Sequence, residues 1–234
     1  MARQKGIIKL KGKIGDISFY KTQDGHLARE KGGVDADRIA NDPAFVRTRE
    51  NGAEFGSSAV AGKNLRVALF AMLQTASDNR VVSRLTKVMT NIKNLDGTSV
   101  RGERNVGVAI ALPAAKALLK NFNFNKKALL GSILFKPYSV NIGTGVITIN
   151  GLEPVNHLNF PPGATHVTLK GAWLKLDFAT GLYDVQATNA VNLPIDATPS
   201  NVVLTPAIPG GAGTDLYLLQ VEFFQEVNAV QYSL

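Results

Sequence analysis

The second half of the chain alternates apolar and polar residues in short runs, and this pattern constrains the fold more than any other feature of the sequence. From about Leu129 the runs are LLGSILF, VNIGTGVITING, HVTLKGAWLKLDF, GLYDVQATNAV, NVVLTPAI and DLYLLQVEFFQEV, separated by Gly, Pro, Asn and Asp. A period of two with frequent turn residues is typical of antiparallel strands. We therefore predict an antiparallel β-sandwich over residues 129–234.

Residues 35–128 show the three-to-four residue spacing of amphipathic helices instead. Asn41-Asp42-Pro43 is a typical helix start, and Gly52 and Gly56 predict that the helix that follows is short or bent. A second helix is expected over residues 61–77, and Asp78 is expected to cap a third that pairs antiparallel with it. Pro113 marks the start of a further helix.

Residues 1–34 contain the most regular stretch of the chain, GKIGDISFYKTQDGHLAREKGG. GIIKLKG, DISFYK and HLARE each predict a short strand, and Thr22-Gln23-Asp24-Gly25 predicts the turn between the last two. A ribbon of this size has little core of its own, so we expect it to pair with something else. The predicted fold class is thus α+β, with an N-terminal β ribbon, a helical middle and a C-terminal antiparallel β-sandwich.

The charges of the chain are divided between its two halves. Residues 1–130 carry 23 Lys and Arg against 11 Asp and Glu, a net charge of +12, whereas residues 131–234 carry 3 against 7, a net charge of −4. A basic front indicates either an anionic partner such as nucleic acid or docking on the acidic back of another copy.

The N-terminal sequence MARQKGIIKLKGKIG has no signal-peptide core, because Lys9 interrupts its apolar run. No window approaches the run of about 18 apolar residues that a membrane span requires. We expect a protein that is synthesised in the cytoplasm without a signal peptide and that can become part of a released particle or an extracellular assembly.

The sequence offers little for catalysis or for cofactor binding. Neither Gly12-Lys13 nor Gly62-Lys63 has the preceding glycine of a phosphate-binding loop, and no nucleophile elbow is present around Ser57-Ser58. The absence of cysteine excludes thiolate metal sites and cysteine nucleophiles.

The remaining candidate groups are scattered. The three histidines lie far apart and are not spaced as metal ligands, and the acidic residues of the β region cannot be assigned to a catalytic pair. The histidines are His26, His157 and His166, and the acidic residues are Glu153, Asp177, Asp184, Asp196, Asp215, Glu222 and Glu226. We therefore expect no catalytic residue, no metal and no cofactor, and a protein that is not an enzyme.

Two functions that need no catalysis remain for the ribbon. Self-assembly by strand addition uses Ile14, Ile17, Phe19 and Leu27 as apolar contacts and Arg29 and Lys31 for charge complementarity. Nucleic-acid binding uses Lys9, Lys11, Lys13 and Lys21 as contacts to an anionic partner, with Tyr20 stacking on a base. The same lysines can instead be solvent-exposed residues of an edge strand that prevent its aggregation with other chains.

The stretches GKIGDISFYKTQDGHLAREKGG and NDPAFVRTRENGAEFG resemble a group of uncharacterised bacterial proteins, mostly from Bacteroidota. These proteins share a conspicuous N-terminal block followed by a more divergent β-rich tail. The resemblance covers about residues 12–56 and implies no activity, cofactor or catalytic residue.

The leading hypothesis is a non-enzymatic structural subunit that forms a homo-oligomer, a filament, a tube or a virus-like particle. Its expected domains are an assembly arm over residues 1–34, a helical region over 35–128 and a β-sandwich over 129–234. The first alternative is a nucleic-acid-binding protein that uses the basic N-terminal region. The second is a carbohydrate- or protein-binding sandwich that exposes Trp173 or Tyr183.

Overall fold

A computed structural model describes residues 2–30 and 32–234 of the chain. Its contacts divide it into two compact units, residues 1–49 and residues 50–234. The strands of the first unit are β1 (Ala2–Arg3), β2 (Gly12–Ile14), β3 (Ile17–Thr22) and β4 (Gly25–Glu30). Helix α1 (Ala36–Asn41) and the 3-10 helix η1 (Pro43–Phe45) follow, and helix α2 (Val46–Ala68) begins in this unit and continues into the second.

The second unit combines helices with two sheets. Its helices are α3 (Phe70–Ala76), α4 (Val81–Lys93), α5 (Val106–Ala109), α6 (Pro113–Leu119), α7 (Leu130–Ile133) and α8 (Pro154–His157). Its strands are β5 (Ser139–Val140), β6 (Ile147–Leu152), β7 (His166–Leu176), β8 (Tyr183–Ala187), β9 (Val191–Pro194), β10 (Ser200–Leu204), β11 (Thr214–Val227) and β12 (Val230–Ser233). The predicted α+β class, with its ribbon, helical middle and antiparallel sandwich, is confirmed.

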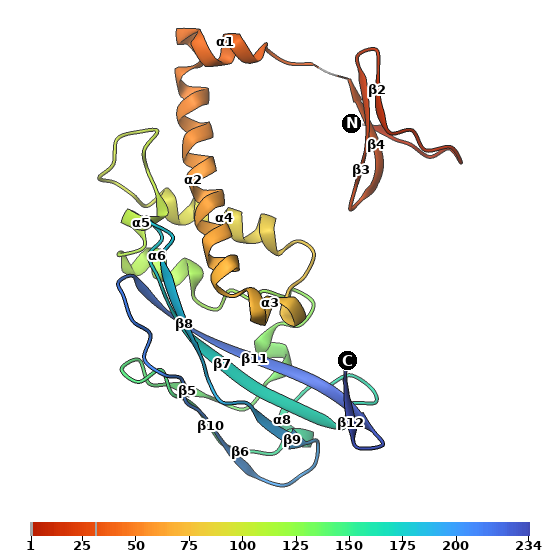
Figure 1. Ribbon diagram of the computed structural model, residues 1–234, viewed down its shortest axis with the longest axis vertical. Coiled ribbons are helices and arrows are strands. Elements are labelled where there is room, and N and C mark those ends of the chain that lie inside the picture. Colours follow the sequence, from red (N-terminus) through yellow and green to blue (C-terminus); the bar gives the residue numbers. More distant parts are fainter. Residues whose placement is uncertain (1, 31) are drawn as a thin grey trace. The chain divides into compact units, whose positions relative to one another are not determined.

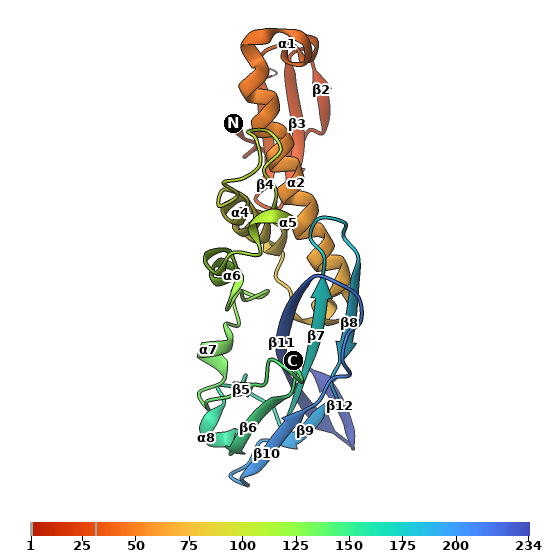
Figure 2. The ribbon, with the colours of Figure 1, turned by 90° about the vertical axis from the view of Figure 1, so that its left-hand side faces the viewer.

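Three layers make up the second unit (Figures 1 and 2). The larger sheet has the order β12-β11-β7-β8, with β9 also paired to β7, and the smaller sheet has the order β10-β6-β5. Helices cover one face of the larger sheet, where Leu174 and Leu176 of β7 join the core around Leu85 and Met89. The smaller sheet covers the other face, where Val167 and Leu169 join Ile149 and Val202. Strand β7 thus contributes to two separate hydrophobic clusters, one with the helices and one with the smaller sheet.

Two local predictions at the helices are confirmed and one is wrong. The Asp42 carboxylate accepts a hydrogen bond from the Ala44 N–H at 2.8 Å and caps η1, with Pro43 in its first turn. The Asp78 carboxylate accepts from the Arg80 N–H at 2.6 Å just before α4, but the N-cap of α4 is Arg80, with no side-chain capping hydrogen bond, so the predicted Asp78 cap is wrong. Pro113 lies in the first turn of α6, as the sequence indicates.

Two further helix predictions are wrong. Helix α2 runs without a break through Gly52 and Gly56, so these glycines do not shorten it. The predicted helix over residues 61–77, the expected antiparallel partner of α4, is instead divided between the end of α2 and α3, and α4 crosses α2 (Figure 1). Gly62 lies at this crossing, where an added Cβ would make ordinary van der Waals contacts with Leu85 at 3.6 Å and Met89 at 3.7 Å, so the packing here does not require glycine.

Candidate functional site: the N-terminal ribbon

The first unit contains a 4-stranded antiparallel sheet of order β1-β4-β3-β2, which we call the ribbon. The predicted turn between β3 and β4 is confirmed, because Thr22 pairs with Gly25 across Gln23 and Asp24. Between β2 and β3, Gly15 has a φ of +57° at the first central position of the turn, as a type II′ turn requires. These two tight turns set the register of three strands.

The segment GIIKLKG is not a strand as predicted, because β2 begins only at Gly12. The Gln4 side chain forms hydrogen bonds with both backbone groups of Leu10. Its amide donates to Leu10 O at 3.3 Å, and its oxygen accepts from Leu10 N at 2.8 Å. Lys9 donates to Gln4 O at 2.6 Å. These bonds bend residues 5–11 into a loop between β1 and β2.

The register places Ile14, Ile17 and Phe19 on one face of the ribbon, because directly opposed residues of antiparallel strands point to the same side. Ile14 is opposite Ile17, and Phe19 is opposite both Gly12 and Ala28. Ile14 and Ile17 are 60% and 44% exposed. We call this the apolar face; its residues are Ala2, Gly12, Ile14, Ile17, Phe19, Lys21, His26, Ala28 and Glu30.

The opposite side of the ribbon gathers positive charge. Arg29 is opposite Ser18, Ser18 is opposite Lys13, and Arg3 is opposite Leu27. The Arg29 guanidinium lies 5.8 Å from the centre of the Tyr20 ring, a cation–π contact. We call this the cationic face; its residues are Arg3, Lys13, Ser18, Tyr20, Thr22, Gly25, Leu27 and Arg29.

The residues predicted for an assembly interface are therefore divided between the two faces. Ile14, Ile17 and Phe19 lie together on the apolar face, whereas Leu27 and Arg29 lie on the cationic face. Lys31 falls outside the described residues.

The lysines predicted to contact an anionic partner are not gathered on one face either. Lys13 lies on the cationic face, and Lys21 lies on the apolar face, opposite His26. Lys9 and Lys11 precede β2 in the loop.

The first unit has no hydrophobic core among its described residues. Not one of residues 2–30 and 32–49 is buried, and the loop residues Ile7 and Ile8 are 100% and 77% exposed. A sheet needs a second layer on at least one face to be stable in water. The ribbon therefore leaves its apolar face available to a covering surface.

A buried ionic cluster in the second unit was not predicted from the sequence. Glu54 on α2 accepts hydrogen bonds from Lys93 Nζ at 2.6 Å, Gly102 N at 2.8 Å and Arg104 Nε at 2.9 Å. The side chains of Glu54 and Lys93 are only 2% and 7% exposed. The Lys93 ammonium, supported by the other two donors and opposed by burial, lowers the pKa of Glu54 to about 2.

This cluster is suited to holding the structure together. The three donors lie 39 to 50 residues after Glu54 in the sequence, and they bind both of its carboxylate oxygens. A carboxylate with a strongly lowered pKa and both oxygens bound is a poor general base at neutral pH. In the sequence, this cluster is indicated only by Glu54 at a core-facing position of α2. The position of Glu54 alone does not identify the residues that bind its carboxylate.

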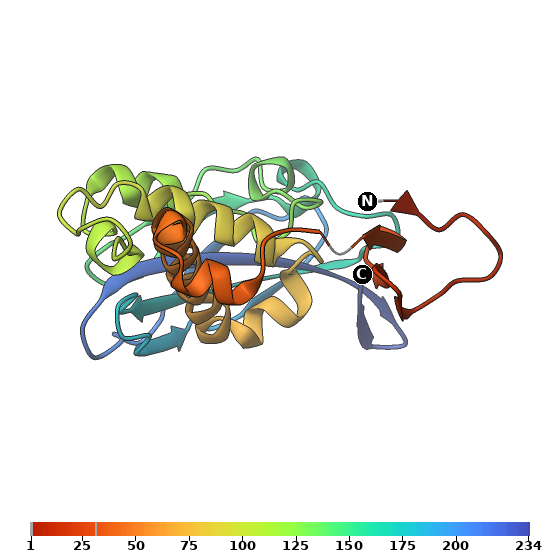
Figure 3. The ribbon, with the colours of Figure 1, turned by 90° about the horizontal axis from the view of Figure 1, so that it is seen from above.

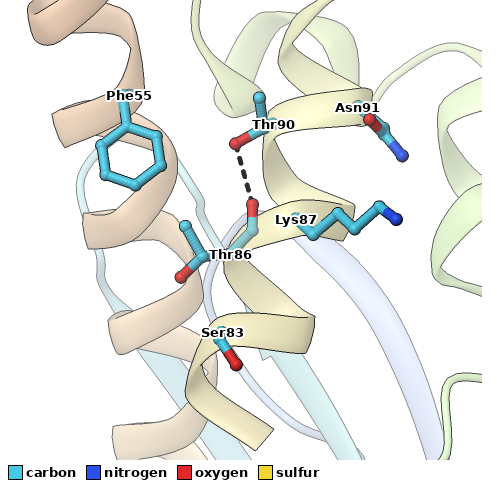
Figure 4. A pocket seen from close by; sticks show the side chains of 6 residues that line it. All are labelled: Phe55, Ser83, Thr86, Lys87, Thr90 and Asn91. Atoms are coloured by element: carbon cyan, nitrogen blue, oxygen red, sulfur yellow. Dashed lines mark hydrogen bonds between the residues drawn. The ribbon is translucent and has the colours of Figure 1, made fainter. Parts of the chain in front are cut away.

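A groove of about 380 Å³ lies between α2 and α4 (Figure 4). Phe55 of α2 lines it, together with Ser83, Thr86, Lys87, Thr90 and Asn91 of α4. The hydroxyl groups of Thr86 and Thr90 donate to carbonyl oxygens one turn earlier in α4, both at 2.9 Å. The two threonine hydroxyl groups are thus bonded within their own helix. Neither forms the hydrogen-bonded pair of nucleophile and base that covalent catalysis requires.

The aromatic residues considered for a ligand-binding sandwich differ in exposure. Trp173 is only 5% exposed, and its Nε1–H donates to Asp215 Oδ1 at 2.8 Å, so its predicted exposure is wrong. The ring lies between the two sheets, where Gly145 approaches it closely. Tyr183, at the start of β8, is 46% exposed.

The three histidines lie on different elements, and His26 is in β4, opposite Lys21. His157 Nδ1 accepts from the Glu153 N–H at 3.0 Å, and His166 Nε2 lies 3.6 Å from Glu226 Oε2. Within the described residues there is no group of three His, Asp or Glu side chains that could hold a metal ion. The same part of the chain contains no helix long and apolar enough to cross a membrane.

Comparison with known proteins finds no similar protein-family model, curated protein or solved structure. A functional assignment therefore has to come from the chain itself.

Proposed function

We propose that the protein is a structural subunit that assembles with copies of itself through its N-terminal ribbon. The observation that carries this proposal is the absence of buried residues among residues 2–30 and 32–49, together with the exposed Ile14 and Ile17 on the apolar face. A sheet with one apolar face favours a partner that covers that face.

The distribution of charge supports the choice of a second copy as the partner. Residues 1–30 carry seven Lys and Arg against three Asp and Glu, whereas residues 176–234 carry six Asp and Glu and no Lys or Arg. A contact between the front of one copy and the back of the next would bring opposite charges together. Such a heterologous contact produces rings or filaments.

The experiment compares three full-length variants by sedimentation velocity and electron microscopy. Ile14→Lys combined with Ile17→Lys places two charges on the apolar face and should abolish assembly. Ser18→Lys introduces the same side chain next to Ile17 but on the cationic face, and should leave assembly intact. Deletion of residues 1–33 should give a monomer.

A wild-type protein that stays monomeric at high concentration would refute the proposal. Equal loss of assembly in the double variant and in Ser18→Lys would show that the apolar face has no special role. Near-UV circular dichroism of each variant checks that the second unit keeps its packing.

A second candidate function is nucleic-acid binding through the cationic face. The observation that favours it is the grouping of Arg3, Lys13 and Arg29 around Tyr20 on one side of the ribbon. Cations that follow a phosphate backbone around an aromatic ring suit a single-stranded nucleic acid.

This alternative is tested by retardation of single-stranded DNA and RNA at increasing salt. Lys13→Glu combined with Arg29→Glu should abolish binding, whereas Ile14→Lys should not weaken it. Absent or salt-independent binding of the wild-type protein excludes this function.

A further inference from the structure

The outer edge of β11 is the longest open strand edge in the second unit. Strand β11 pairs with β7 over residues 214–224 on one side, but with β12 only over residues 224–227 on the other (Figure 3). By comparison β8 and β10 span five residues each. Asn189 also caps the edge of β10, because its amide donates to Val203 O and its oxygen accepts from Thr205 N.

The backbone direction of β11 follows from three hydrogen bonds near its end. Leu234 N donates to Phe223 O on the β12 side at 3.0 Å, whereas Thr165 N donates to Phe224 O on the β7 side at 2.8 Å. Glu226 N donates to Thr165 Oγ1, also on the β7 side, at 2.7 Å. Backbone groups alternate in direction along a strand. Odd-numbered residues therefore point outward.

The register between β11 and β7 is continuous from Thr214 to Phe224, so this alternation holds along the strand. The outward residues beyond β12 are Asp215, Tyr217, Leu219 and Val221. Their outward N–H and C=O groups have no hydrogen-bond partner within the described residues. This row of donors and acceptors can pair with an incoming strand.

This edge also lacks the usual protection against strand addition. Natural edge strands carry lysine, proline or bulges. Residues 214–223 contain no Lys, no Pro and no break in register. The apolar side chains Leu216, Leu218 and Leu219 are half-buried, whereas Leu174 and Leu169 of β7 are 0% exposed. The leucine side chains of β11 thus pack against the two hydrophobic clusters and remain partly exposed.

We propose that the edge of β11 at residues 215–221 accepts strand β2 and the preceding Lys11 from the ribbon of a second copy. This inference rests on the proposed function and adds the docking site. The backbone N–H and C=O of Ile14 point toward Ile17 on β3, because these two residues flank the tight turn. Backbone groups alternate in direction along a strand, so those of Lys13 point away from β3. Residues 9–14 contain three lysines and no acidic residue, whereas residues 214–234 contain three acidic residues and no Lys or Arg. Two of these acidic side chains also have a lysine of β7 nearby: Lys170 Nζ lies 2.8 Å from Glu222 Oε2, and Lys175 Nζ lies 3.8 Å from Asp215 Oδ1. Pairing of two β11 strands would lack this complementarity.

The first test uses proline at an outward position. Leu219→Pro removes one outward N–H and places a ring in the path of the incoming strand, a substitution that an open edge tolerates. Leu219→Ala removes the same side chain but keeps the N–H. We expect Leu219→Pro to raise the concentration for half-assembly by at least about tenfold relative to Leu219→Ala. Equal behaviour of the two variants would overturn the inference.

The second test measures proximity between copies and does not depend on how well the proline variant folds. The chain has no cysteine, so single cysteines can be labelled cleanly. Donor-labelled Lys13→Cys protein is mixed with acceptor-labelled Ala212→Cys protein, whose label lies just before β11. Asn150→Cys, exposed on β6 of the smaller sheet, is the matched control.

We expect energy transfer to position 212 to exceed transfer to position 150 in the assembled protein. Assembly with equal or stronger transfer to position 150 would overturn the β11 site and leave self-assembly standing. Assembly that survives Lys11→Glu combined with Lys13→Glu would also overturn it. A protein that never assembles would refute the proposed function itself, so the two failures are distinguishable.

Discussion

Replacement of Glu54 by Gln should destabilise the second unit strongly, although the two side chains have nearly the same volume. The substitution leaves the Lys93 ammonium buried without its counter-charge, and Lys93 is only 7% exposed at the side chain. Loss of one partner of a buried ion pair costs about 3–5 kcal/mol. The Gln oxygen can still accept one hydrogen bond, and Arg104 is 29% exposed and can be hydrated. We therefore expect a loss of about 3 kcal/mol, at the lower end of that range.

The effect should depend on pH in a defined direction. The pKa of Glu54 is lowered in the folded state from 4.5 to about 2, so its ionised form stabilises the fold. A lowered folded-state pKa gives stability that is complete above the unfolded pKa and disappears as the pH falls toward the folded one. The difference between wild type and Glu54→Gln should be constant above about pH 6 and shrink between pH 5 and pH 2.

Urea unfolding followed by the fluorescence of Trp173 measures this difference. It is the single tryptophan of the chain and is buried between the sheets, so it reports on the second unit. Glu103→Gln is the matched control, because Glu103 has an exposed side chain near the same cluster. It should change stability by less than about 0.5 kcal/mol. A loss below about 1 kcal/mol for Glu54→Gln, or a loss independent of pH, would refute the reasoning.

Two further substitutions test the packing of the second unit and its last turn. Leu85→Ala removes a fully buried side chain at the crossing of α2 and α4 and should cost about 2–5 kcal/mol in urea unfolding. Val82→Ala, half-exposed on the same helix, should cost under about 1 kcal/mol, and equal losses would contradict the packing. Ala229→Gly should stabilise by about 1 kcal/mol, because Ala229 has a φ of +61° in the turn between β11 and β12. Ala197→Gly, at a position without positive φ, should lower the thermal midpoint, and a parallel decrease for Ala229→Gly would exclude strain in the turn.

The fold class was predictable because it depends on local pattern. Alternation specified the strands of the sandwich, and Asp42 and Pro43 specified a helix start through bonds within one turn. The predictions that failed depended on contacts between distant residues. The continuity of α2 through Gly52 and Gly56 is an example, since the packing of this helix outweighs the low helix propensity of glycine.

The candidate site could be predicted only in part for the same reason. Alternation identified Ile14, Ile17 and Phe19 as ribbon residues, but only the register shows that Leu27 and Arg29 lie on the opposite face. A period of two does not specify how neighbouring strands align. The strand pattern of residues 214–227 was visible in the sequence, but the length of the open edge of β11 depends on where β12 ends.

The central claim is that this chain assembles with itself, and direct imaging of the purified protein tests it best. Negative-stain electron microscopy, combined with sedimentation velocity over a wide concentration range, should reveal rings, filaments or closed particles far larger than the 25.0 kDa chain. A single 25.0 kDa species at every concentration, with no ordered particles in the images, would contradict the account.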